Sequence, residues 1–153
     1  MLARFSLAPT RRHWNEIKHL FRYLCGTKDL VLYFSKSNNF SGLLGYANTG
    51  YLFDPHKARS QTGYVFTYNG TAISWHSTKQ TIVATSSNHS EILTLHKASR
   101  ECVWLRSVIS HIQNTYEFSL STGMPTPIFT DNAACIAQVR GGYIKGDRTK
   151  HFS

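Results

Sequence analysis

Three polar residues stand at positions where the chain could do chemistry. Asn48 and Asp131 each follow a short apolar run, and Glu91 precedes a long amphipathic one. Carboxylate oxygens are the ligands that hard divalent cations such as Mg²⁺ prefer, whereas an asparagine amide offers one neutral acceptor oxygen. If the fold brings the three side chains together, they would form an oxygen-rich site that holds two negative charges.

Each of these residues also has an ordinary structural interpretation. Asn88 and Glu91 have the spacing of a capping box, in which Asn88 caps a helix and Glu91 returns to the Asn88 amide. Asp131 is suited to cap the short helix that follows it. Asn48 could be a turn residue at the end of a strand. Spacing alone therefore favours structural roles for all three.

The composition indicates a folded, basic protein. The chain has 153 residues, of which 41% are hydrophobic and 13% aromatic, so it is long and apolar enough for one domain with a core. Seventeen Lys and Arg face only eight Asp and Glu, and the net charge is +9. This imbalance fits a surface that binds a polyanion, or a basic protein that binds nucleic acid without specificity.

The cysteines and the N-terminal segment indicate in which cellular compartment the protein is expected. Cys25, Cys102 and Cys135 are odd in number and lack the spacing of a metal site, so we expect buried, reduced thiols. Reduced thiols indicate an intracellular protein, cytoplasmic or nuclear. The segment Met1–Asn15 is basic and free of acids, which makes a mitochondrial location an alternative. No apolar run reaches the length of a membrane span, and we expect no membrane partner.

Apolar residues near the start recur at helical spacing. The pattern predicts a helix that Thr10 caps and Gly26 closes, with one buried face. That face comprises Trp14, Ile17, Leu20, Phe21 and Leu24.

The rest of the chain alternates between strand-like and helix-like runs. Strands are predicted over 30–34, 43–47, 63–68, 72–76 and 127–130. Asn69-Gly70 predicts a tight hairpin, because both residues tolerate positive φ, and 54–57 reads as a polar turn.

Two further helices complete the predicted order. One runs from about Asn88 to His111, and a short one runs from Ala133 to Val139 before Gly141-Gly142. Three antiparallel strands, a helix, a further strand and a helix predict an α/β fold, in which helices pack on a mixed sheet.

The polar segments and the stretches between them resemble the ribonuclease H (RNase H) domain of copia-type LTR retrotransposon polyproteins. The three polar segments are Gly45–Asn48, Ser86–Glu91 and Ile128–Asn132, and the most specific matching stretches are Ser60–Phe66, Ala72–Trp75, Ala98–Arg106 and Asp131–Ala137. The resemblance extends from about Leu2 to Phe152. It implies one RNase H-like domain over 1–153. Within it, 1–28 is a helical segment from the region before the core, and 29–153 is a core that lacks the last strand and helix.

The resemblance also implies a specific chemistry. RNase H enzymes hold two divalent cations about 4 Å apart with clustered carboxylates. Glu91 and Asp131 match two acids of the family, and Asn48 stands where the family carries the aspartate that bridges both metals. The fourth family acid has no counterpart. Replacing a carboxylate between two dications by a neutral amide is expected to cost metal binding several kcal/mol.

From this departure we expect a pseudoenzyme, a domesticated retrotransposon-derived protein without catalytic activity. It would act through a protein partner or self-association at an exposed sheet edge. One alternative is a basic nucleic-acid-binding module. The other is a residual Mg²⁺-dependent RNase H that cleaves RNA in RNA–DNA hybrids. No cofactor is expected, except that Glu91 and Asp131 would be the ligands if a residual site binds Mg²⁺ or Mn²⁺.

Overall fold

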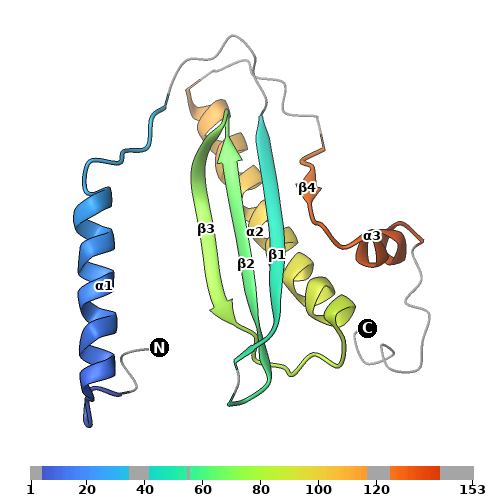
Figure 1. Cartoon of the computed structure of the whole chain (residues 1–153). Helices are drawn as coiled ribbons and strands as arrows, with labels where there is room; N and C mark the ends of the chain where they lie inside the picture. Colours follow the sequence, from blue (N-terminus) through green and yellow to red (C-terminus); the bar gives the residue numbers. More distant parts are fainter. Residues whose placement is uncertain (1–4, 35–41, 55, 117–124, 142–153) are drawn as a thin grey trace. The chain divides into compact units, whose positions relative to one another are not determined.

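The chain divides into two compact units, Met1–Tyr33 and Phe34–Ser153. The computed structural model describes residues 5–34, 42–54, 56–116 and 125–141. The first unit contains the helix α1 (Arg11–Thr27), and the second contains a sheet and two helices (Figure 1). The prediction of a single RNase H-like domain over 1–153 stays a prediction.

Helix α1 begins as predicted and ends differently. Thr10 is the N-cap: it accepts the N–H of His13 on its hydroxyl, and its own N–H donates to the His13 ring at 3.1 Å. Gly26 does not close the helix, which continues to Thr27 and is capped by Lys28 in a right-handed conformation. The early stop was wrong because the backbone at this end adopts no positive φ, the conformation for which a terminal glycine is selected.

The predicted buried face of α1 is also wrong, since no residue of the helix is buried. Trp14 and Phe21 are both exposed. An amphipathic helix buries its apolar stripe only against a second layer. The stripe of α1 is therefore an unpartnered apolar surface in the first unit.

The predicted strand over 30–34 is absent. These residues form no strand, and Val31, Tyr33 and Phe34 are exposed. Their β-branched and aromatic character favours an extended chain, but a strand becomes stable only when a neighbour completes its hydrogen bonds.

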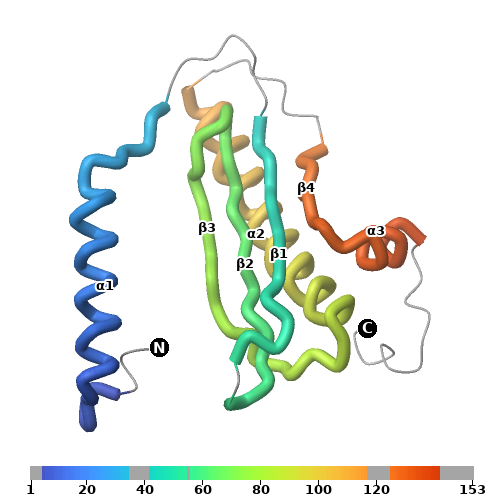
Figure 2. Tube along the Cα trace, in the orientation of Figure 1, coloured from blue at the N-terminus to red at the C-terminus, as the bar shows by residue number. Residues whose placement is uncertain are grey.

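The second unit is built on a mixed sheet, and the predicted α/β fold of RNase H-like type, a mixed sheet with flanking helices, is confirmed. Its strands are β1 (Leu43–Asp54), β2 (Arg59–Tyr68), β3 (Thr71–Lys79) and β4 (Ile128–Phe129), in the order β3-β2-β1-β4. The first three pair antiparallel, and β4 lies parallel to β1 (Figure 2). The hairpin between β2 and β3 turns at Asn69 and Gly70, with φ of 50° and 81°, as predicted.

Strand β1 is longer than predicted. Asn48 pairs with Gly63 in the middle of the β1–β2 ladder, so it is not a turn residue. The strand continues to Asp54 because β2 supplies partners over this length, with an irregularity between Gly50 and Asp54.

A long helix covers one face of the sheet. Helix α2 (Ser87–Thr115) packs on β1 and β2, and Figure 1 shows it crossing behind these strands. The core between them contains Leu43, Ala47, Phe66, Ala98, Cys102 and Leu105. Gly45 makes room for Phe66, because a Cβ at this position would lie 2.6 Å from the Phe66 ring.

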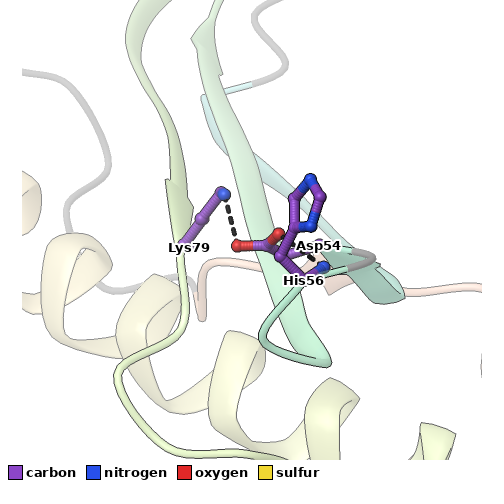
Figure 3. A network of polar contacts seen from close by, with 3 residues as sticks. All are labelled: Asp54, His56 and Lys79. Carbon is purple, nitrogen blue, oxygen red and sulfur yellow. Dashed lines mark hydrogen bonds and ion pairs between the residues drawn. The ribbon is translucent and has the colours of Figure 1, made fainter. Parts of the chain in front are cut away.

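A buried ion pair joins the far end of β1 to β3 (Figure 3). Asp54 is buried, and its Oδ2 accepts from Lys79 Nζ at 2.5 Å. Its Oδ1 accepts the N–H of His56 at 3.2 Å, at the start of the turn over 56–58. The carboxylate thereby holds the predicted polar turn against the edge strand.

The remaining helix is α3 (Ala133–Arg140), which contacts α2. Cys102 and Cys135 are buried and free, but Cys25 is exposed, so the expectation of three buried thiols is wrong for the cysteine on α1. Within the described ranges, no helix combines the length and the apolar character that crossing a membrane requires. The compartment stays a prediction.

Candidate active site

Parallel pairing of β4 with β1 brings the strands that precede Asp131 and carry Asn48 side by side. Gly45 lies opposite Ile128, and Tyr46 lies opposite Phe129. The pairing ends there, with Asn48 two residues further along β1 and Asp131 two residues after Phe129. Asn48 therefore lies within β1, whereas Asp131 follows the end of the neighbouring strand β4.

Helix α2 supplies Glu91 from its N-terminal part. The helix is capped by Ser86, whose hydroxyl accepts the N–H of His89 at 3.1 Å. It therefore begins before Asn88, and the capping-box interpretation of Glu91 is wrong. Asn88 instead donates its side-chain amide to Gln138 on α3 at 2.7 Å.

The Glu91 carboxyl sits between β1 and Asp131. Only 6% of the residue is exposed, and burial is the main cause that raises its pKa. The negative charge of Asp131 raises the pKa further, whereas the backbone N–H of Thr49, which donates to the carboxylate, lowers it. The net direction is upward. Glu91 and Asp131 are thus close enough to repel each other.

Asp131 has no capping role either. The N-cap of α3 is Asn132, whose side-chain oxygen accepts the N–H of Cys135 at 2.8 Å. The helix begins one residue later than an Asp131 cap would require. Asp131 is exposed at the end of β4. The structural interpretations that spacing favoured for Glu91 and Asp131 are therefore both replaced by other residues.

A buried thiol borders the site, which sequence reasoning missed. Cys135 on α3 is fully buried, and burial raises its pKa, with the charge of Glu91 as a second cause. The uncharged thiol of Cys135 therefore lies beside the carboxylates. Its apolar helical setting indicated burial, but no sequence signal placed it beside Glu91.

Gln80 is the second residue that sequence reasoning missed. It lies just after β3, is buried, and donates its amide to the carbonyl of Ser90 at 2.9 Å. The hydroxyls of Thr62 and Thr94 lie 3.2 Å from the same nitrogen. Gln80 thus ties the start of α2 to the strands and fixes the helix turn that carries Glu91.

The structure brings Glu91 and Asp131 together. Asn48 is not shown to join them, because it alternates with Ala47, which is buried under α2, and so lies on the same open face as Tyr46. Among the residues that the structure describes, no group of three His, Cys, Asp or Glu is placed to hold a metal ion. Oxygens of Glu91 and Asp131 offer a hard cation two negative charges. This donor set suits one weakly held cation better than two.

Comparison with known proteins shows which family the chain belongs to. It is 37% identical over 105 residues to Secreted RxLR effector protein 161 of Plasmopara viticola, which covers 69% of this chain and 73% of the effector. The chain belongs to the family of this effector protein. No family model matches the chain, and no solved structure matches it.

The chain also matches part of several transposon polyproteins. The chain is 34% identical over 112 residues to the retrovirus-related Pol polyprotein from transposon TNT 1-94 of Nicotiana tabacum. It is 31% identical over 131 residues to that from transposon RE2 of Arabidopsis thaliana. The matches cover 73% and 86% of this chain but 8% of each polyprotein. A retrotransposon origin of this region is thus supported.

Proposed function

We propose that this chain is a copia-type RNase H-like domain that has lost two-metal cleavage and acts by binding. The observation that supports it is the proximity of Glu91 to Asp131, while strand β1, which pairs with β4, carries the amide of Asn48 in place of a third acid. In the family that the sequence resembles, the Asn48 position carries the metal-bridging aspartate.

The charge at the site explains why cleavage is lost. Two dications about 4 Å apart repel each other strongly, and only clustered anionic ligands offset this repulsion. Glu91 and Asp131 supply two negative charges. The raised pKa of Glu91 means that ionising its carboxyl costs more than it does for an exposed glutamate. An amide at position 48 leaves the pair of cations without its shared anionic ligand.

The test is cleavage of a labelled RNA–DNA hybrid in Mg²⁺ and in Mn²⁺. Wild type, Asn48→Asp, Asp131→Asn and the Asn48→Asp/Asp131→Asn double variant are compared. We expect no cleavage by wild type. Cleavage by Asn48→Asp that disappears in the double variant would show that position 48 alone stops the chemistry. Metal-dependent cleavage by wild type that Asp131→Asn abolishes would overturn the proposal.

Self-association through a sheet edge is the first binding mode that we propose. β3 is the terminal strand of the sheet order, and no strand among the described residues pairs with its outer side. An unpaired edge can add a strand from another chain. Light scattering over a range of protein concentrations tests this mode. A monomer at every concentration would rule out self-association.

A second candidate function is nucleic-acid binding, which the net charge of +9 favours. The few acidic residues repel a nucleic acid only weakly, because Asp54 is paired with Lys79 and Glu91 is buried. Binding through phosphates weakens steeply as salt rises. Affinity for single-stranded or hybrid probes that stays flat between low and physiological salt would count against this function.

A further inference from the structure

The sheet face opposite α2 carries a row of large side chains. Tyr46 pairs with Val65, Val65 pairs with Trp75, and on the other side Tyr46 pairs with Phe129. Residues that pair directly across strands point to the same face of a sheet. One row of four side chains, here called the aromatic row, therefore crosses the sheet from β3 to β4.

The aromatic row is open to solvent. Trp75 is 65% exposed, Phe129 51%, Tyr46 47% and Val65 38%. The rings of Tyr46 and Phe129 stack on each other, with centroids 5.4 Å apart and planes 24° apart. Within the second unit, α2 packs on the opposite face and α3 packs against α2, so neither helix covers the row.

The strand positions around the aromatic row add no acidic charge that would oppose an anionic partner. The positions that alternate onto this face, within 44–50 on β1, 61–67 on β2 and 75–79 on β3, include no carboxylate, and the basic residue among them, Lys79, is paired with Asp54. Asp131 follows Phe129 by two residues, so acidic charge approaches the row at one end only. The chain as a whole carries a net charge of +9.

We propose that the aromatic row binds single-stranded nucleic acid, with bases that stack on Trp75 and on the Tyr46–Phe129 pair. Exposed aromatic rings on a sheet offer bases a platform that tolerates any sequence, because every base has a flat π-face. Neighbouring strands lie about 4.8 Å apart, so Trp75 and Tyr46, two strands apart, stand about 10 Å from each other. Duplexes keep their bases stacked inside and cannot use this platform.

Charge decides between this partner and an apolar protein. An apolar row alone would suit either, but a chain with 17 basic and 8 acidic residues attracts a polyanion. This inference rests on the second candidate function and specifies its surface. It is independent of cleavage, because stacking needs no metal and can be measured in EDTA.

The experiment measures the affinity of the full chain for labelled oligouridine and oligothymidine of about 20 nucleotides, by fluorescence anisotropy at low salt. The variant is Trp75→Ala. The matched control is Trp104→Ala, which removes a tryptophan of similar exposure, 58%, from α2 on the covered side of the sheet. Trp75→Phe keeps an aromatic ring. Circular dichroism of each variant confirms that it folds.

We expect Trp75→Ala to weaken binding about 5- to 150-fold, the range that loss of a base–aromatic stack produces. Trp104→Ala should bind as wild type does, and Trp75→Phe should retain most of the affinity. A similar loss for both oligonucleotides would mean that the row reads bases without regard to the sugar. A loss for oligouridine alone would assign the row to RNA.

Other outcomes separate this surface from the function on which it rests. Salt-dependent binding that Trp75→Ala leaves unchanged would overturn the aromatic row as the binding surface and keep the candidate function. No binding of either oligonucleotide would overturn both. Absence of binding together with a concentration-dependent dimer that Trp75→Ala dissociates would assign the row to a protein partner instead.

A direct readout uses Trp75 as the sole fluorophore. In a chain with Trp14→Phe and Trp104→Phe, all tryptophan emission comes from position 75. Stacked bases should quench this emission in proportion to the bound fraction. Emission that remains constant while anisotropy reports saturation would place the oligonucleotide elsewhere.

Discussion

The two faces of the sheet come from the same strands and have opposite fates. Phe66 on β2 is fully buried under α2, whereas Val65 beside it, with its partner Trp75, faces solvent. Both faces carry large apolar side chains. The difference is the helix that packs on one of them. An apolar position in a strand therefore becomes core or binding surface according to which layer reaches it.

The covered face also contains a network of buried, hydrogen-bonded polar side chains. Gln80 and the hydroxyl of Thr62 lie beneath α2 and meet Thr94 of that helix, and Glu91 reaches the strands at the same side. Polar groups buried there must be paired, so changes are costly. On the open face, water satisfies polar groups and substitutions should be tolerated.

The largest expected effect is on the covered face. Phe66→Ala should lower the free energy of unfolding by about 3–5 kcal/mol, because the side chain is fully buried beside Gly45 and a cavity would remain. Urea unfolding measures the change. Phe66→Leu is the matched control and should cost less. A loss below about 1 kcal/mol for Phe66→Ala would mean that α2 does not hold the core as described.

Gln80→Leu tests the polar part of the same face. The free energy of unfolding should fall by about 1–3 kcal/mol, because the Ser90 carbonyl loses its donor inside the core. Gln61→Leu is the control, since Gln61 donates to Ser77 on the open face and should matter little. Equal losses in thermal or urea unfolding would contradict the contrast between the two faces.

Glu91→Gln should raise stability at neutral pH, by less than the two losses above. The pKa of Glu91 is raised in the folded state, so its contribution is fully present below its ordinary pKa and is lost as pH rises through the raised value. The neutral glutamine avoids this loss. Melting temperatures of variant and wild type should converge in acid, below about pH 4, and separate at pH 7. A difference that is independent of pH would exclude this cause.

The smallest expected effect is on the open face. Trp75→Ala should change the free energy of unfolding by no more than about 0.5 kcal/mol, as for an ordinary surface position. Its effect on oligonucleotide binding should be much larger. A large loss of stability in urea would show that another part of the molecule covers the row.

Sequence patterns predicted the elements whose partners are close along the chain. Asn69-Gly70 marked the hairpin, and Thr10 marked the start of α1, because turn and cap chemistry is local. The prediction of a strand over 30–34 failed because strand propensity is realised only when a neighbouring strand is present. The sequence of this segment does not specify such a neighbour. The interpretation of Asn48 as a turn residue failed because a partner strand is present: β2 pairs with β1 beyond Asn48 and so extends the strand.

The candidate site was predictable only in part. The residue types of Asn48, Glu91 and Asp131 were evident, and the family resemblance named their positions. Their capping alternatives could be rejected only once Ser86 and Asn132 were seen to cap the helices. Spacing of one or two residues decides a cap, and sequence periodicity does not resolve a helix start that finely.

By itself, the sequence determined the kind of fold, the excess of basic charge and the presence of an amide at a position where the resembling family has an acid. These depend on residue identity and local pattern. Only the tertiary structure decided that β4 pairs parallel with β1, that burial and the charge of Asp131 raise the pKa of Glu91, and that neither helix of the second unit covers the row from Trp75 to Phe129. Each of these depends on contacts between segments far apart in the chain, which local preferences do not specify.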